Sequence, residues 1–128
     1  MKILHENNHK VVVCDSLGET CIFDVMNVET PRALFVINDR ECFLLHFYVP
    51  FHLRGNGIGK KMLLEIAHEC LKHGCRRIDL DDMSDRYREN KNIYVQTGFK
   101  YRNTSGPEMY TSPRYLIKIL KTKHNLYI

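Results

Sequence analysis

The sequence lacks the features of a membrane-spanning or exported protein. None of its apolar runs approaches the roughly 18 residues that a membrane helix needs, and the longest, residues 43–49, has the length of a strand. The first residues turn polar too early for a signal peptide. The five cysteines are odd in number and form no Cys-x-x-Cys pair. We therefore expect reduced thiols in an intracellular, cytoplasmic protein with no membrane partner.

The chain also lacks repeats, low-complexity stretches, linkers and a strong excess of charge. Its 128 residues predict a single domain over residues 1–128. An apolar fraction of 44% excludes a disordered chain. The net charge of +4 favours an anionic ligand but is too small for a dedicated nucleic-acid binder. Histidines and cysteines alternate at positions 68, 70, 73 and 75. We nevertheless expect no metal site, because only Cys70 and His73 among them share a helix face.

The first half of the chain is patterned for strands. Turn residues separate its β-rich runs, which predicts a four-stranded antiparallel meander. The expected strands are residues 10–14, 20–26, 33–37 and 42–49.

After Pro50 the pattern changes to that of helices packed on a sheet. Apolar residues at three- and four-residue spacing predict a helix from Ile58 to the turn before Gly74. A strand at 77–81 can then pair parallel to the strand before the helix, as a β-α-β unit. Later elements are expected as a helix from Ser84 to Thr97, strands at 99–102 and 115–120, and a loop at 103–107. The fold class is therefore α/β (α+β), with a mixed sheet and helices packed on it.

Residues 54–61, Arg-Gly-Asn-Gly-Ile-Gly-Lys-Lys, carry the most chemical information. Three glycines in five residues let the backbone curl with its N–H groups pointing inward. The helix that follows adds free N–H groups and the positive end of its dipole. Arg54, Lys60 and Lys61 add full charges. The segment predicts a site for a phosphate or pyrophosphate.

Two common phosphate-binding loops fit this segment poorly. A Walker A loop needs Ser or Thr where Lys61 stands, so no side chain is placed to hold magnesium. A dinucleotide-binding loop needs its third glycine one residue later than Gly59 and begins directly after its strand. Asp79 and Asp81 do lie about 20 residues on, where a ribose-binding acid is expected, so this reading is weakened and not excluded.

Arg54, Gly57 and Gly59 match the pattern Gln/Arg-x-x-Gly-x-Gly/Ala, and residues 93–99 look like the pattern Leu-Tyr-x-x-x-Gly-Phe. Together and in this order, the two motifs resemble the signatures of the GNAT superfamily of acyl-CoA N-acyltransferases. The resemblance covers about residues 42–120. It implies a mixed, mostly antiparallel sheet with a central β-α-β unit that binds acetyl-CoA as co-substrate. The N-terminal half is shortened, since only a turn fits where the family usually has two helices.

The resemblance also implies where acetyl-CoA lies. The pantetheine arm is expected at the backbone near Tyr48 and Val49, and the pyrophosphate at the amides from Gly55 to Lys60. Tyr87 stands where the family often has an Asn that contacts pantetheine, and Asn90 or Asn92 is a candidate substitute. The expected cofactor-binding residues are Tyr48, Val49, Arg54, Gly55, Asn56, Gly57, Ile58, Gly59, Lys60 and Asn92.

The implied reaction is acetyl transfer to a primary amine by direct attack in a ternary complex. Tyr94 is the implied general acid to the leaving sulfur, because a phenol is a donor that stays protonated at neutral pH. The general base is left open among Glu41, Asp82, His46 and solvent. Asp82 has a second reading as part of a helix-capping cluster, and His46 has one as a core histidine.

The shortened N-terminal half favours an open acceptor groove, and hence a protein or peptide amine over a small molecule. Two alternatives stay open, an acyl-CoA-binding module without catalysis and a basic scaffold that binds nucleic acid. The oligomeric state is left open. Such single-domain enzymes occur in bacteria and look similar to proteins of large DNA viruses, which adds host cytoplasm or nucleus as an expected location.

Overall fold

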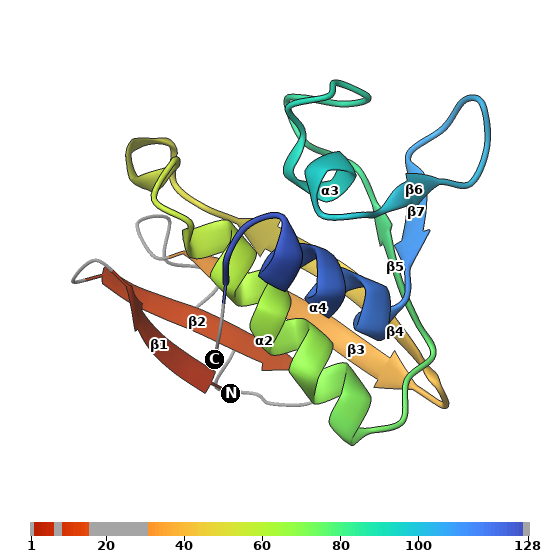
Figure 1. The fold of residues 1–128 in the computed structure, drawn as a ribbon, viewed down its shortest axis with the longest axis horizontal. Coiled ribbons are helices and arrows are strands. Elements are labelled where there is room, and N and C mark those ends of the chain that lie inside the picture. The colour runs from red at the N-terminus through yellow and green to blue at the C-terminus, as the bar shows by residue number, and fades with distance from the viewer. Residues whose placement is uncertain (1, 7–8, 16–30, 127–128) are drawn as a thin grey trace.

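The computed structural model describes residues 2–6, 9–15 and 31–126 (Figure 1). They form one seven-stranded sheet in the order β1-β2-β3-β4-β5-β7-β6. The strands are β1 (Lys2–Glu6), β2 (His9–Asp15), β3 (Arg32–Asn38), β4 (Glu41–Tyr48), β5 (Arg77–Asp81), β6 (Lys100–Tyr101) and β7 (Glu108–Thr111). The helices are η1, a 3₁₀ turn at Phe51–Leu53, and α2 (Ile58–Lys72), α3 (Ile93–Gln96) and α4 (Pro113–Thr122).

The expected fold class is confirmed. Neighbouring strands run antiparallel except at the β2–β3 and β4–β5 pairs, so the sheet is mixed and mostly antiparallel. The β4–α2–β5 segment is the central β-α-β unit, with residues 41–44 paired parallel to 77–80. Beyond Leu44 and Leu80 the two strands no longer pair, and Figure 1 shows β5 and β7 turning away from β3 and β4.

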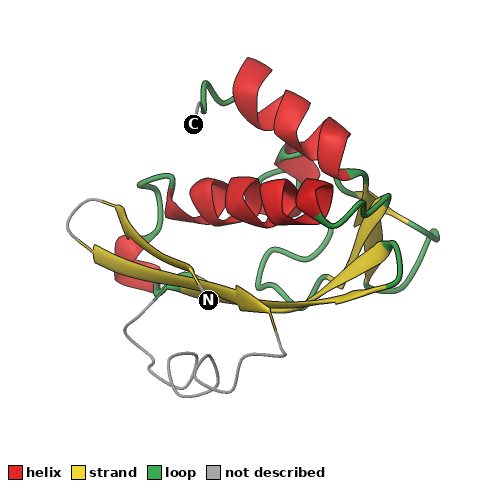
Figure 2. Cartoon of the chain, turned by 90° about the horizontal axis from the view of Figure 1, so that it is seen from below, coloured by secondary structure: helices red, strands yellow, loops and turns green. Residues whose placement is uncertain are grey.

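Helices α2 and α4 cover one face of the sheet (Figure 2). The predicted apolar stripe of α2 is confirmed, because its residues at three- and four-residue spacing are buried against the sheet and α4. Each such Leu or Ile contributes about 1.5–3 kcal/mol by leaving water. The buried side chains of α2 include Ile58, Met62, Leu63, Ile66, Ala67 and Cys70. None of the helices in the described ranges is both long and apolar enough to cross a membrane.

The predicted meander is wrong at its N-terminal end. Strand β2 pairs parallel to β3, and a parallel pair requires a crossover connection where a meander has a hairpin. Strand β1, which the sequence did not predict, pairs antiparallel to β2. The strand expected at 20–26 lies outside the described residues. So does the connection where only a turn was expected.

The helix predicted from Ser84 to Thr97 is wrong over most of its length. Residues 84–92 form turns, and only Ile93–Gln96 is helical. The Ser84 backbone N–H and hydroxyl both donate to Asp82, which gives this segment a local alternative to helix. Arg88 then takes a positive φ of 61°, which an α-helix does not accept.

The strand predicted at 115–120 is wrong as well, because these residues lie in α4. The side chain of Ser112 accepts from the Tyr115 N–H as an N-cap, and Pro113 occupies the first turn. Leu116, Ile119 and Leu120 are the buried face of the helix. The apolar run fits the periods of both a strand and a helix. Strand β7, just before α4, was missed, while the loop at 103–107 contains no helix or strand.

Candidate functional site

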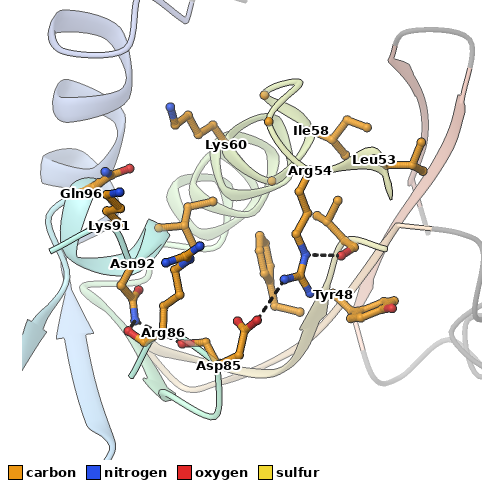
Figure 3. Close-up of a pocket in the computed structure, with 17 residues that line it drawn as sticks. Tyr48, Leu53, Arg54, Ile58, Lys60, Asp85, Arg86, Lys91, Asn92 and Gln96 are labelled. Atoms are coloured by element: carbon orange, nitrogen blue, oxygen red, sulfur yellow. Dashed lines mark hydrogen bonds and ion pairs between the residues drawn. The ribbon is translucent and has the colours of Figure 1, made fainter. Parts of the chain in front are cut away.

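A cavity of about 410 Å³ lies where β4 ends and α2 begins (Figure 3). One wall is the end of β4 with the glycine loop, and the other is the turn segment 84–92 with α3. All of the expected cofactor-binding residues line this cavity except Asn56. Asn56 donates its side-chain amide to the Leu53 carbonyl at 3.1 Å, so it shapes the loop from outside the cavity.

The glycine loop has the conformation that its composition requires. Gly55 and Gly57 have φ values of 86° and 81°, in the left-handed region that other residues rarely adopt. Gly57 is the N-cap residue of α2, and its first turn has neither a side-chain cap nor an acidic residue. The uncapped N–H groups and the positive end of the helix dipole are therefore available to an anion, with no acidic side chain in the same turn to compete for them.

Gly59 serves a different purpose, which is close packing. A Cβ at this position would come within 2.8 Å of the Ile93 Cδ1 and 3.5 Å of the Phe47 ring. The helix α2 therefore approaches α3 and β4 more closely than a residue with a side chain would allow. This contact brings the two walls of the cavity together.

Arg54 connects the glycine loop to both walls. Its Nε donates to the Val49 carbonyl at 2.9 Å, and its guanidinium forms an ion pair with Asp85 at 3.4 Å, as Figure 3 shows. Both side chains are largely exposed, so this ion pair contributes little to stability. Its geometric effect is to join the strand end to the turn segment 84–92.

The cavity lining is rich in positive charge. Its cationic side chains are Arg54, Lys60, Arg86 and Lys91, and Asp85 is its carboxylate. Sequence analysis missed Arg86 and Lys91, because no local pattern marks them and only the folding of residues 84–92 against the glycine loop brings them here. A lining of this charge suits a ligand with several negative charges.

Asn92, which lines the cavity, forms a buried hydrogen-bonded pair with Asp82 behind it, and the two residues are 1% and 2% exposed. The Asp82 carboxylate accepts from the Ser84 hydroxyl and N–H, the Tyr101 hydroxyl and the Asn92 amide, the last at 2.7 Å. Burial alone would raise the pKa of Asp82, but these hydrogen bonds outweigh burial and lower it. The side-chain carbonyl of Asn92 in turn accepts from the Tyr94 N–H at 2.7 Å and caps α3.

Arg88 fixes the turn segment 84–92 from its outer side. Its backbone N–H donates to the Tyr101 hydroxyl at 2.8 Å. Its guanidinium donates to the carbonyls of Asn103 at 3.1 Å and Gly106 at 2.9 Å. These bonds explain why a non-glycine residue holds a positive φ here. They hold the cavity wall against the loop between β6 and β7.

Tyr94 lies beside the cavity and does not line it. The residue is 8% exposed, and its ring packs edge-on against Phe47 and Phe99, each at a centroid distance of 5.8 Å. Phe47 does line the cavity, so Tyr94 contacts the lining through this ring. Burial, with a smaller contribution from Asp82, raises the pKa of Tyr94 well above its usual range. Within the described part of the chain, no hydrogen bond engages its hydroxyl.

The candidate bases lie outside the cavity lining. Glu41 begins β4, roughly 23 Å along the strand from Tyr48, and it forms an ion pair with Arg77 at 3.0 Å. His46 is exposed on β4 and accepts a hydrogen bond from Arg32 at 3.2 Å. Burial and the Arg32 charge lower the pKa of His46. Asp82 is buried behind the cavity wall, so the roles given to these residues and to Tyr94 stay predictions.

Comparison with known proteins gives the following similarities. The family model described as the acetyltransferase (GNAT) family matches residues 31–99. The structure of PaiA N-acetyltransferase from Thermoplasma acidophilum, in complex with coenzyme A, is similar with a TM-score of 0.52 and 26% identity, over 61% of this chain and 50% of that chain. Ard1 from Thermoplasma volcanium is similar with a TM-score of 0.51 and 17% identity, over 62% of this chain and 60% of that chain. A search of curated protein sequences found no match.

Proposed function

This chain belongs to the GNAT acetyltransferase family, and from that premise we propose that it transfers the acetyl group of acetyl-CoA to a primary amine. The observation that carries the proposal is one cavity in which a glycine-rich helix N-terminus meets a cationic lining. The similar PaiA N-acetyltransferase structure, which holds coenzyme A, supports the same class of ligand.

The residues present fit the charge of coenzyme A. The uncapped first turn of α2 offers backbone N–H groups for the pyrophosphate, and Lys60 stands in that turn. Arg86 and Lys91 supply further cations from the opposite wall. When bound, acetyl-CoA supplies an activated thioester.

Acetyl transfer needs a neutral amine and a proton for the departing thiolate. Tyr94 is the donor we propose, because its raised pKa keeps the phenol protonated across the neutral range and nothing described competes for its hydroxyl. Because Tyr94 does not line the cavity, a lining side chain next to it, such as Phe47, has to shift for its hydroxyl to reach the sulfur. The Val49 N–H, just beyond the last residue of β4 that pairs with β3, is our proposed donor to the thioester carbonyl.

We propose that solvent, and not a side chain, takes the proton of the amine. Glu41 is held by Arg77 at the far end of β4, and Asp82 has its carboxylate engaged by four donors. A lysine-type amine has a pKa of about 10.4, so kcat/KM should rise steadily from pH 6 to 9. A plateau below pH 8 that Glu41→Gln or His46→Gln abolishes would contradict this.

The acceptor we propose is a protein or peptide amine. An open groove suits a protein or peptide better than a small molecule that must be fully enclosed. Peptides with lysine and N-terminal amines, assayed beside polyamines and aminoglycosides, test it. Turnover of the small molecules alone would overturn the acceptor class and leave acetyl transfer standing.

One observation favours a second candidate, an acyl-CoA-binding module without catalysis, because Tyr94 does not line the cavity. Thermal melting with acetyl-CoA, CoA, NAD and ATP in parallel tests binding, since a ligand at 100 times its Kd adds about 2.7 kcal/mol. Stabilisation by acetyl-CoA and CoA alone supports both candidates against a general nucleotide site. No stabilisation by either of these two compounds would refute both candidates. Tyr94→Phe then separates them, because the enzyme should lose roughly 10²-fold or more in turnover with binding intact.

A further inference from the structure

The two oxygens of the Asp82 carboxylate serve different parts of the cavity wall. The Oδ1 atom accepts from the Ser84 N–H and hydroxyl, at the start of the turn segment 84–92. The Oδ2 atom accepts from the Tyr101 hydroxyl of β6 and from the Asn92 amide, at the other end of that segment. Asp82 follows β5 directly and is 2% exposed, so the carboxylate is shielded from solvent. The proposed acetyl transfer has so far given it no part in the reaction.

Asp82 decides which end of the Asn92 amide faces α3. Although burial raises it, the hydrogen bonds lower the pKa of Asp82 overall, so at neutral pH the carboxylate is ionised and can only accept. The Asn92 Nδ2 therefore points at Asp82, at 2.7 Å. The same Nδ2 donates to the Ser84 Oγ and to the Arg86 carbonyl, both at 3.2 Å. The side-chain oxygen of Asn92 is thereby directed toward the Tyr94 N–H, from which it accepts at 2.7 Å.

Helix α3 depends on this cap, because it contains only four residues. A helix of this length is unstable by itself, since most of its cost lies in fixing the first turn. Tyr94 is the second residue of the helix, and Asn92 holds its N–H. The Tyr94 ring packs edge-on against Phe47 and Phe99. The backbone from which this ring projects is thus fixed by hydrogen bonds that lead from Asp82 through Asn92.

The charge of Asp82 also acts on the Tyr94 phenol directly. Burial is the main cause that raises the pKa of Tyr94, and the negative charge of Asp82 is the second. A nearby negative charge disfavours a phenolate, so the carboxylate lies close enough to influence the hydroxyl through space. Hydrogen bonding and electrostatics therefore connect the same two residues by different routes.

We propose that Asp82 is a positioning residue for acetyl transfer, which through Asn92 fixes the place of the Tyr94 phenol beside the cavity. The inference rests on the proposed function, in which Tyr94 protonates the departing thiolate. A reacting group misplaced by about 1 Å can cost roughly 10²-fold in rate, so the orientation of the Asn92 amide affects kcat. Asp82 itself exchanges no proton with the substrates, because its buried carboxylate already accepts from four donors.

The first test compares two variants of the full chain that each remove one hydrogen bond from this carboxylate. Asp82→Asn keeps the shape of the side chain but has a single oxygen. The Ser84 N–H cannot reverse its role, so that oxygen stays on its side and the new amide N–H₂ group faces Asn92. Tyr101→Phe removes a different bond and leaves the one to Asn92 in place. Both variants should lower the Tm, because each leaves a buried group with one partner fewer.

The two variants should differ in kinetics. We expect Asp82→Asn to lower kcat roughly 10-fold, because the proton donor is misplaced. Tyr101→Phe should leave kcat nearly unchanged and raise the KM for acetyl-CoA, because Tyr101 also accepts from the Arg88 N–H that holds the cavity wall. Equal kcat values in the two variants would overturn the assignment. Asp82→Glu, which displaces the carboxylate by one methylene group, takes the same tests where Asp82→Asn does not fold.

A double-mutant cycle shows whether Asp82 acts through the phenol. In a Tyr94→Phe background, Asp82→Asn should lower kcat no further, because the group that it positions is absent. A loss of the same size in both backgrounds would contradict the proposal and leave Tyr94 as the acid. Unchanged turnover in Tyr94→Phe alone would refute the proposed acid and this inference with it, so the two failures are distinguishable.

A second measurement needs no turnover. It follows the Tyr94 ring in the ¹³C NMR spectrum of the tyrosine-labelled chain, where the signal is assigned by its loss in Tyr94→Phe. The signal should shift in Asp82→Asn and stay in place in Tyr101→Phe. A Tyr94 signal that Asp82→Asn does not move would overturn the proposal, whether or not the chain acetylates an amine.

Discussion

Replacing Asn92 by alanine should damage both the fold and the cofactor site. The Asn92 side chain caps α3 through the Tyr94 N–H and donates to the Asp82 carboxylate, both at 2.7 Å. Loss of an N-cap costs about 1 kcal/mol. Removing a donor from a buried carboxylate costs about 2 kcal/mol more. We therefore expect Asn92→Ala to lower the free energy of unfolding by about 3 kcal/mol.

The measurement is urea denaturation, with thermal melting beside it. A loss of this size lowers the Tm of a domain of this length by about 10 °C. Asn90→Ala is the matched control, because Asn90 is an exposed residue of the same turn segment. Its loss should stay within about 0.5 kcal/mol. Coenzyme A binding should weaken in Asn92→Ala more than in Asn90→Ala, because Asn92 lines the cavity and anchors its wall.

Asn92→Asp separates the cap from the amide donor. The carboxylate retains an oxygen for the Tyr94 N–H but faces Asp82 with a like charge. The folded-state pKa of the introduced acid is raised, so the variant's stability should fall as pH rises above its unfolded pKa of about 3.9. Equal stability of Asn92→Ala and Asn90→Ala, or an Asn92→Asp variant insensitive to pH, would refute the role given to this pair.

Three further predictions follow from the same geometry. Gly98→Ala should lower the free energy of unfolding more than Gly106→Ala does. Both glycines have φ near 100°, but only at Gly98 would a Cβ meet an aromatic ring of α4, at 2.7 Å. Equal losses in denaturation would contradict that contact. The pKa of Asp82 is lower in the folded state than its value of about 3.9 in the unfolded state, so its carboxylate stabilises the fold at pH values above about 3.9. This stabilisation is lost as the pH falls through the folded-state pKa. Asp82→Asn should therefore make the free energy of unfolding depend less on pH in the acid range. Lys60→Gln should weaken coenzyme A binding about 5-fold and Lys61→Gln should not, because of these two lysines only Lys60 lines the cavity. Equal effects of the two substitutions in calorimetry would contradict the proposed position of the pyrophosphate.

The parts of the site that follow from local chemistry could be predicted from the sequence. The glycine loop is contiguous, its glycines are required by its own backbone angles, and the helix behind it has a clear apolar stripe. The parallel pairing of β4 and β5 follows from the single helix that joins them. No distant residue has to be known for any of these conclusions.

The opposite wall of the cavity depends on contacts between distant residues, and the helix predicted there from the sequence was wrong over most of its length. Residues from Ser84 to Thr97 begin with a plausible N-cap and are followed by Gly98, which together resemble the two ends of a helix. What decides their shape is the Asp82 carboxylate, which binds Ser84, Asn92 and Tyr101 at once. Tyr101 comes from a strand that forms later in the chain. Arg86 and Lys91 reach the cavity only because this arrangement forms.

The end of the chain shows why periodicity alone was insufficient. The run from Tyr115 to Leu120 alternates well enough for a strand and also places Leu116, Ile119 and Leu120 on one helix face. The deciding signal was the dipeptide Ser112-Pro113, an N-cap followed by a proline in the first turn. It lies before the apolar run, whose own residues do not distinguish a helix from a strand.

The two motifs that carried the family resemblance are physically one unit. The last glycine of the loop, Gly59, has no side chain where Ile93 of the second motif packs against it, and Phe47 bridges the loop strand to Tyr94. This contact gives a physical reason why the two short motifs, in that order, together indicate the family more strongly than either does alone. The position of Tyr94 and the proposed binding of the pyrophosphate depend on the same close approach at Gly59.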